Sequence, residues 1–89
     1  MAIRFTVTLT PSFRRDLENL SRAVQNKILE ALKRLESHPF GPAPAIKKLK
    51  GTGVGQWRLR VGLYRVRYDV VHRDVVLYRV RHRKDIYRD

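Results

Sequence analysis

Alternation of apolar and cationic side chains in the last third of the chain restricts the fold more than any other feature. Between residues 57 and 81, apolar or aromatic residues recur at every second position, and arginine fills many positions between them. A period of two is typical of a β-strand, whose successive side chains point to opposite faces of a sheet. Gly62-Leu63 suits a type II′ hairpin turn, and a second turn falls at 72–74. The pattern predicts three antiparallel strands, at 57–61, 64–70 and 75–81.

This alternation predicts one apolar and one cationic sheet face. The apolar face, expected to lie under helices, collects Trp57, Leu59, Val61, Tyr64, Val66, Tyr68, Val76, Tyr78 and Val80. The opposite face collects Arg58, Arg60, Arg65, Arg67, Arg79 and Arg81. Such a face favours a polyanionic partner, because guanidinium groups match phosphate oxygens in bidentate fashion. Several of these arginines could instead pair with Asp69, Asp74 or Asp85, but three carboxylates cannot neutralise six arginines.

The first half of the chain predicts a strand followed by a helical hairpin. Residues 3–9 alternate in hydropathy as a half-buried strand does. Thr10-Pro11 is an N-cap followed by proline at the first helical position, which predicts a short helix to about Leu20. Ser21 can cap a second helix that ends before Pro39. Its apolar stripe is Val24, Ile28, Ala31, Leu32 and Leu35. We therefore expect an α+β domain spanning 1–89, in which the N-terminal strand and helical hairpin precede three antiparallel strands that form one sheet with helices on one face.

Composition narrows the class of partner. The 89 residues carry a net charge of +12, of which residues 47–89 contribute +9 (thirteen basic against four acidic residues). Nucleic acid fits this charge better than a membrane surface, because the excess lies in strand-like sequence rather than in a basic amphipathic helix. The absence of cysteine excludes disulfides and favours a cytoplasmic setting. We expect neither a membrane span nor a secretion signal.

A long connection separates the two halves. Residues 38–55 contain three prolines, four glycines and the cluster Lys47-Lys48-Leu49-Lys50. We expect a functional loop here, because a connection of this length is unusual in so small a domain. It could contain a brief helical turn that Ile46 and Leu49 anchor. The glycines match neither the Walker spacing nor the dinucleotide fingerprint, so a flexible approach to the next strand is expected.

Catalytic candidates are few. His38, His72 and His82 lack metal-ligand spacing, and clustered carboxylates for a two-metal nuclease are missing, so we expect no metal and no other cofactor. Tyr87 follows the run Arg81-His82-Arg83-Lys84, whose positive field would lower the pKa of a phenol and make it a usable base. Composition alone favours the other interpretation, in which Tyr87 packs the C-terminal tail onto the sheet.

The order of elements resembles the RelE/ParE superfamily of bacterial toxins from toxin–antitoxin pairs. The resemblance covers nearly the whole chain. It rests on Lys48-Leu49-Lys50-Gly51, Trp57-Arg58-Leu59-Arg60-Val61-Gly62, Tyr64-Arg65-Val66-Arg67-Tyr68 and His82-Arg83-Lys84-Asp85-Ile86-Tyr87. RelE-like members are ribosome-dependent endoribonucleases that cut mRNA in the A site. ParE-like members inhibit DNA gyrase and lack the combination of basic residues and tyrosine.

The RelE-like pattern implies roles for individual residues. Its catalytic set would fall on Arg58, Arg60, Arg65, Arg81, Arg83 and Tyr87, and its RNA-binding set on Lys47, Lys48, Lys50, Arg67, Arg79 and His82. Tyr87 would be the base, and Arg58 and Arg65 would hold the phosphate. Family members often have lysine where this chain has Arg58 and Arg60, and arginine is a poor proton shuttle.

The resemblance further implies an acidic cognate antitoxin, a ribosome with mRNA in its A site, and operator DNA bound by the toxin–antitoxin complex. Two other functions stay open at this point. One is a ParE-like gyrase inhibitor without catalytic activity, and the other is a non-toxic basic module that binds nucleic acid.

Overall fold

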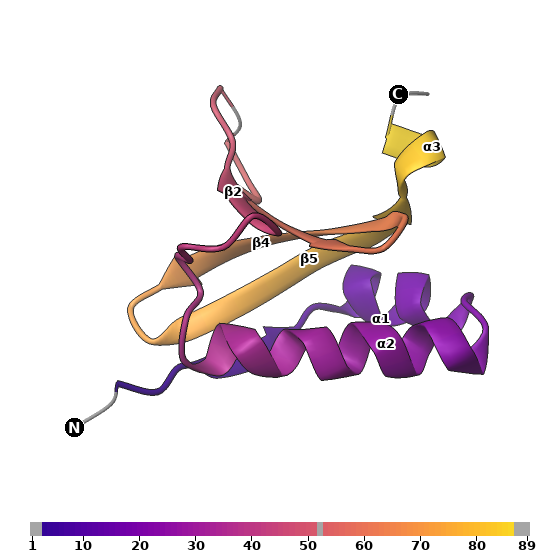
Figure 1. The fold of residues 1–89 in the computed structure, drawn as a ribbon, viewed down its shortest axis with the longest axis horizontal. Helices are drawn as coiled ribbons and strands as arrows, with labels where there is room; N and C mark the ends of the chain where they lie inside the picture. Colours follow the sequence, from indigo (N-terminus) through magenta and orange to yellow (C-terminus); the bar gives the residue numbers. More distant parts are fainter. Residues whose placement is uncertain (1–2, 52, 87–89) are drawn as a thin grey trace.

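The computed structural model describes residues 3–51 and 53–86, and it contains one five-stranded sheet with two helices on one face (Figure 1). The strands are β1 (Thr6–Leu9), β2 (Ile46–Lys48), β3 (Trp57–Val61), β4 (Tyr64–Val71) and β5 (Asp74–His82). The helices are α1 (Pro11–Glu18), α2 (Arg22–Leu32), the 3₁₀ helix η1 (Lys33–Glu36) and the single turn α3 (Arg83–Ile86). The sheet order is β1-β5-β4-β3-β2. β1 runs parallel to β5, and the other neighbours are antiparallel. The predicted α+β class is confirmed.

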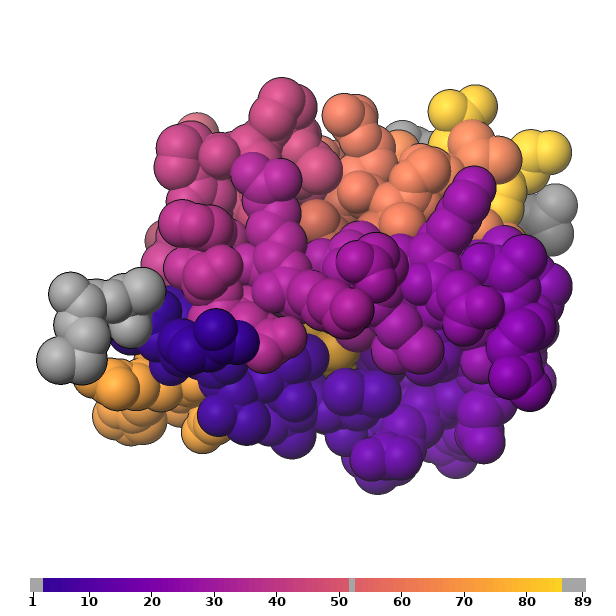
Figure 2. Space-filling view, turned by 60° about the horizontal axis from the view of Figure 1, so that its bottom comes forward, coloured from indigo at the N-terminus to yellow at the C-terminus, as the bar shows by residue number. Residues whose placement is uncertain are grey.

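The helical hairpin forms where its capping residues predict it. Thr10 Oγ1 accepts a hydrogen bond from the Phe13 amide at 3.2 Å, and Ser21 Oγ accepts one from the Val24 amide at 3.3 Å. Both bonds satisfy amides that have no partner within the first helical turn. Figure 2 shows residues of α1 and α2 covering much of one face of the molecule.

The connection at 38–55 contains a strand, so the helical turn expected around Ile46 and Leu49 is wrong. Residues Ile46–Lys48 pair with β3, in the register Ile46↔Leu59 and Lys47↔Arg58. The Leu49 amide donates to Gln56 O at 2.7 Å and extends the ladder. Ile46 is buried, and pairing with an existing sheet edge stabilises a strand whose own sequence is too short and too polar to indicate one.

The sequence analysis assigned Val76 and Tyr78 to the wrong face of the sheet, because β5 contains a β-bulge. Arg67 pairs with Arg79, but the next residue, Tyr68, pairs with Leu77, so β5 contains one extra residue. Val75 and Leu77 are therefore fully buried in place of the predicted Val76 and Tyr78. A strict period of two cannot continue through an inserted residue, because the insertion exchanges the two faces. The predicted β3–β4 turn is present, and Gly62 has the positive φ of +58° that its first position requires.

The core lies between the helical hairpin and the apolar sheet face. It includes the fully buried Phe13, Ile28 and Leu35 from the first half of the chain and Val66 and Tyr68 from β4. The Tyr68 hydroxyl donates to Pro39 O at 2.7 Å, and burial raises the pKa of Tyr68 well above its usual value. In the described part of the chain, no helix is long and apolar enough to cross a membrane.

Candidate functional site

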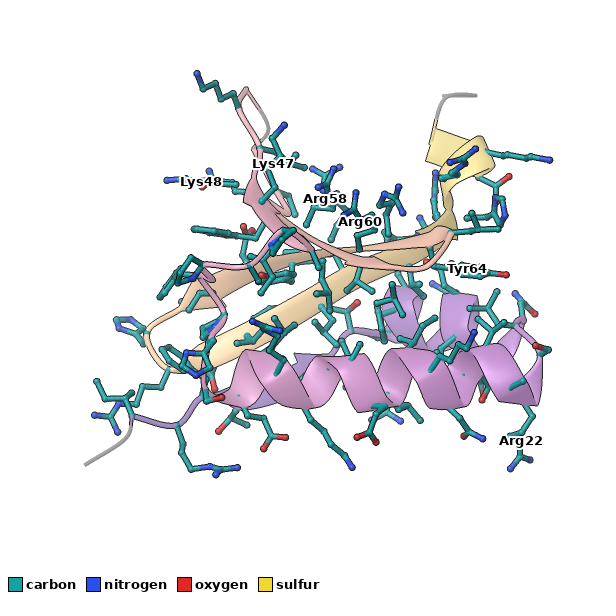
Figure 3. All side chains as sticks on the ribbon, viewed as in Figure 1. Arg22, Lys47, Lys48, Arg58, Arg60 and Tyr64 are labelled. Carbon is teal, nitrogen blue, oxygen red and sulfur yellow. The ribbon has the colours of Figure 1, made fainter. Side chains whose placement is uncertain are left out.

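Two rows of cations cross the sheet on the face opposite the helices. The strand register aligns Lys47, Arg58 and Arg67 in one row, and Arg60, Arg65 and Arg81 in the other. We call these six residues the cationic face. Residues directly opposite each other on antiparallel strands have Cβ atoms roughly 4.5–5.5 Å apart and share a face of the sheet. Figure 3 shows Arg58 and Arg60 projecting away from the helices, with Lys47 beside them. The structure therefore brings together cations from four strands.

Arg58 lies at the centre of the first row and has an unsatisfied donor. Its Nε atom is buried and has no hydrogen-bond partner within the described residues. Its cross-strand neighbours are Lys47 on β2 and Arg67 on β4, both of them cations. Like charges directly opposite each other destabilise a sheet, and a buried donor without a partner adds to that cost. The local arrangement therefore suits an anion better than it suits the protein alone.

Arg65 is held at the β3–β4 turn. Its Nη1 atom donates to Gly62 O and to Tyr64 O, each at 3.1 Å. These bonds fix one end of the guanidinium group against the backbone of the hairpin. The side chain is thereby restricted to the second row, between Arg60 and Arg81.

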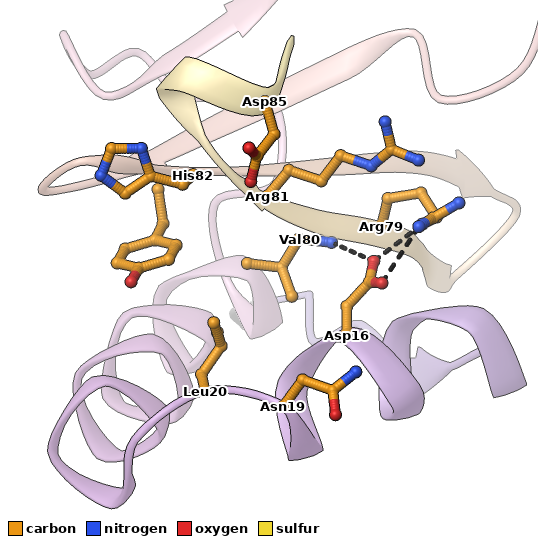
Figure 4. A pocket seen from close by; sticks show the side chains of 9 residues that line it. Asp16, Asn19, Leu20, Arg79, Val80, Arg81, His82 and Asp85 are labelled. Atoms are coloured by element: carbon orange, nitrogen blue, oxygen red, sulfur yellow. Dashed lines mark hydrogen bonds and ion pairs between the residues drawn. The ribbon is translucent and has the colours of Figure 1, made fainter. Parts of the chain in front are cut away.

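Arg79 is ion-paired with a residue of helix α1. Its Nε and Nη2 atoms donate to the two carboxylate oxygens of Asp16 at 2.7 and 3.0 Å, and Asp16 also accepts the Val80 amide at 3.1 Å (Figure 4). Asp16 thus takes the place of a neighbouring strand at Val80, because β1 pairs with β5 only as far as Leu77. Asp16 also lines a pocket of about 460 Å³, together with Arg81, His82 and Asp85. The sequence analysis missed Asp16 because its partner is 63 residues away.

The three lysines that follow Ile46 do not share one face of the sheet. Lys47 is in register with Arg58, whereas Lys48 pairs with Trp57 and places its Nζ atom 5.9 Å from the centre of that ring. Lys50 is exposed in the bend that follows β2. Of the three lysines, Lys47 alone belongs to the cationic face by strand register.

A second cluster that the sequence did not indicate fastens this bend to the sheet. Asp69 accepts the amides of Gly55 and Gln56 at 2.9 and 2.7 Å, and Arg67 Nε donates to Gly55 O at 2.7 Å. Burial, followed by the negative charge of the nearby Asp69 carboxylate, raises the pKa of Tyr78. The bulge in β5 explains why Tyr78 lies on this side of the sheet.

The end of β5 leads into α3. His82 Nδ1 accepts the Lys84 amide at 3.1 Å, and the His82 ring packs edge-on against Tyr64 with centroids 5.3 Å apart. Arg83 is exposed, and its amide donates to Leu63 O at 2.7 Å. Tyr87 lies outside the described residues. Among the residues that are described, no three His, Cys, Asp or Glu side chains gather as metal ligands.

Comparison with known proteins identifies relatives of the whole fold. The family model for the ParE toxin of type II toxin–antitoxin systems matches residues 7–87. The chain is 31% identical to a chain in the toxin–antitoxin complex RelBE2 from Mycobacterium tuberculosis, with a TM-score of 0.77 over 90% of this chain and 99% of that one. None of the curated proteins matches the chain.

Two archaeal complexes are also similar. The RelB–RelE antitoxin–toxin complex from Methanococcus jannaschii has a chain that is 27% identical, with a TM-score of 0.70 over 89% of this chain and 93% of that one. The RelE–RelB complex from Pyrococcus horikoshii has one that is 28% identical, with a TM-score of 0.70 over 90% and 96%. These structures confirm the predicted RelE-like arrangement of strands and helices.

Proposed function

The chain belongs to the ParE toxin family of type II toxin–antitoxin systems, within the RelE/ParE superfamily. We propose that it is a ribosome-dependent endoribonuclease that cuts mRNA and blocks translation. The observation that carries the proposal is the cationic face, where Arg58 has a buried donor without a partner between two further cations. A chain of phosphates supplies both the missing acceptor and the missing negative charge. The reaction takes place in the cytoplasm, where translating ribosomes are found.

The proposed reaction is an attack of an RNA 2′-hydroxyl on the adjacent phosphate. The new bond joins the 2′ oxygen to phosphorus, and the bond from phosphorus to the 5′ oxygen breaks. The products are a 2′,3′-cyclic phosphate and a free 5′-hydroxyl. A base must take the proton of the 2′-hydroxyl, cations must stabilise the phosphorane, and an acid must protonate the leaving oxygen. We assign Arg58 and Arg65 to the phosphate. Arg81 or Arg83 would stabilise the negative charge on the leaving oxygen, which then takes its proton from water. No metal takes part in this scheme.

Tyr87 is the proposed base, and two of the other tyrosines, Tyr68 and Tyr78, suit that role less well. Tyr68 is buried under the sheet and donates to a carbonyl, and its raised pKa disfavours the phenolate. Burial and the negative charge of Asp69 raise the pKa of Tyr78 as well. A phenolate is stabilised by surrounding cations, and Tyr87 stands three residues after the basic run Arg81-His82-Arg83-Lys84.

A gyrase inhibitor is the second candidate, and one observation favours it. The family model that matches residues 7–87 is the one described for the ParE toxin. Inhibition of gyrase by binding would need neither Tyr87 nor a row of phosphate-binding arginines. The cationic face is therefore the reason for placing the ribonuclease first.

An acidic antitoxin is the proposed partner of either toxin. All three similar structures described above are toxin–antitoxin complexes. An acidic segment that crosses the cationic face would complement its charge and accelerate association. We further propose that the complex binds operator DNA. Expression of the whole operon should therefore yield a co-purifying acidic protein.

Induction of the toxin in bacteria tests the proposal. Protein synthesis and plasmid supercoiling are measured in parallel after induction. A ribonuclease stops translation early and leaves supercoiling intact, whereas a gyrase inhibitor causes DNA damage while translation continues. Arg65→Ala should lose the effect on translation. Arg14→Ala should retain it, because Arg14 is exposed on α1, on the helical side of the sheet. Relaxed plasmids with continuing translation would refute the ribonuclease.

A further inference from the structure

The bend between β2 and β3 is fixed to the sheet by three side chains. Asp69 accepts two consecutive backbone amides, at Gly55 and Gln56, and the Tyr78 ring lies against Gly55. Arg67 donates from Nε to Gly55 O at 2.7 Å and from Nη2 to Val54 O at 3.3 Å. These donors and acceptors of the short backbone segment are thus matched by two residues of β4. We call Arg67, Asp69 and Tyr78 the clamp.

Gly55 fits the clamp so closely that no larger residue would be accommodated without movement. It is buried and has a φ of +69°, which L side chains rarely adopt. A Cβ atom at this position would lie 3.3 Å from Arg67 Cβ and 3.6 Å from Tyr78 Cδ2. The backbone at residue 55 therefore rests directly on two clamp side chains.

The clamped segment is continuous with β2, which carries a cation of the cationic face. The Leu49 amide bonds to Gln56 O, so the residue beside the clamp is tied to the end of β2. Two residues before Leu49, Lys47 is paired with Arg58. Figure 3 shows Lys47 and Arg58 on the same side of the sheet. Since β2 has three residues and pairs with β3 alone, it depends on this closure to keep its position.

We propose that Asp69 is a positioning residue for the polyanion site, because it holds the β2–β3 bend so that Lys47 stays beside Arg58. The inference rests on the proposed function because it takes RNA as the polyanion. Arg67 would help to hold the bend in place by its hydrogen bonds to Val54 O and Gly55 O, in addition to any contact with phosphate. Release of the clamp should remove the contribution of Lys47 while the arginines on β3 remain in place.

A simpler role for Asp69 makes the opposite prediction. A carboxylate near a cationic face opposes anion binding, so its neutralisation should strengthen binding of RNA by simple electrostatics. Asp69→Asn raises the formal net charge from +12 to +13. It also replaces one acceptor oxygen with an amide group that cannot accept the hydrogen bond from Gly55 or Gln56. If positioning dominates, the more positive protein binds RNA more weakly.

The experiment compares Asp69→Asn with Asp74→Asn by binding to a short single-stranded RNA over a range of salt concentrations. Asp74 is exposed and makes no side-chain hydrogen bond or ion pair within the described residues, so its variant changes the charge alone. We expect Asp74→Asn to bind as well as the parental protein or better. We expect Asp69→Asn to bind at least about fivefold more weakly near 0.1 M salt, which corresponds to one lost phosphate contact, with a shallower salt dependence.

A charge-neutral pair repeats the test. Gly55→Ala should disturb the clamp and weaken binding, whereas Gly53→Ala has open space around it and should not. Amide hydrogen exchange at Gly55 and Gln56 should accelerate in Asp69→Asn. Unchanged exchange, or tighter binding by Asp69→Asn alongside Asp74→Asn, would overturn the inference. Heparin serves as a second polyanion. If the parental protein binds heparin but not the free RNA, the heparin series tests the clamp by itself, and the induction experiment remains the test of the ribonuclease.

Discussion

Replacement of Arg58 by methionine should stabilise the free protein while it weakens RNA binding. Arg58 Nε is a buried donor without a partner in the described chain, and such a donor costs about 1–3 kcal/mol. The guanidinium group also faces Lys47 and Arg67 across neighbouring strands, and each like-charge contact of this kind costs about 0.2–1 kcal/mol. Methionine keeps most of the aliphatic volume of arginine and removes both penalties.

The expected gain is smaller than the sum of these values because Arg58 is only partly buried. Water screens the repulsion at its exposed end, so we expect an increase of about 1–2 kcal/mol in the free energy of unfolding. For a domain of this size, that gain corresponds to a rise of roughly 5–15 °C in the melting temperature. RNA binding should fall about fivefold near 0.1 M salt, the effect of one phosphate contact.

Urea and thermal denaturation measure the stability, and salt separates the two contributions. Near 1 M salt the Debye length is about 3 Å, so the repulsive part of the gain should shrink while the part due to the buried donor stays. Arg14→Met is the control, since it removes an exposed arginine from α1 and should change stability by less than about 0.5 kcal/mol. A less stable Arg58→Met protein would refute the claim that the cations of this face oppose folding.

Three further predictions concern the reaction and the tyrosines. Tyr87→Phe removes only the phenolic oxygen, so cleavage should fall about 10²–10⁴-fold while ribosome binding persists, and cleavage at the parental rate would make Tyr87 a packing residue. Arg65→Ala should weaken both binding and cleavage, and should lower the salt dependence of binding by roughly one charge; a loss of cleavage alone contradicts this role. Stability should fall as pH rises above about 10, because unfolded tyrosine ionises there whereas Tyr68 and Tyr78 have raised pKa values and stay protonated in the folded state. Tyr68→Phe should reduce this loss, and an unchanged loss would contradict the assignment.

Much of the fold follows from periodicity and capping residues. The two helices begin after Thr10 and Ser21, whose side chains accept hydrogen bonds from amides three residues further along the chain. The residues that determine each helix start are therefore all local in sequence. The β3–β4 hairpin is also local, because Gly62 begins a two-residue turn between two alternating runs. Prediction of the arginines on one face required only that this alternation continue across the turn.

The features that the sequence did not indicate all depend on contacts between distant residues. The pair Asp16–Arg79 joins residues 63 apart, and Asp69 bonds to amides 13 and 14 residues earlier. The bulge before Arg79 inserts a residue without any glycine or proline to mark it. β2 is a strand because an edge of the sheet accepts it. In each case the local sequence permits several outcomes, and the tertiary structure selects one.

The cationic face connects the proposed activity with the need for a partner. Rows of cations that repel one another lower the stability of the free toxin, and any ligand that binds only the folded state restores it in proportion to its affinity. In our proposal RNA and an acidic antitoxin bind the same arginines, so each would exclude the other from the part of the surface they share. An antitoxin that covers Arg58 would therefore both inhibit the toxin and protect its fold. Because the restored stability comes from charge pairing at Arg58, the antitoxin should stabilise Arg58→Met less than it stabilises the parental protein.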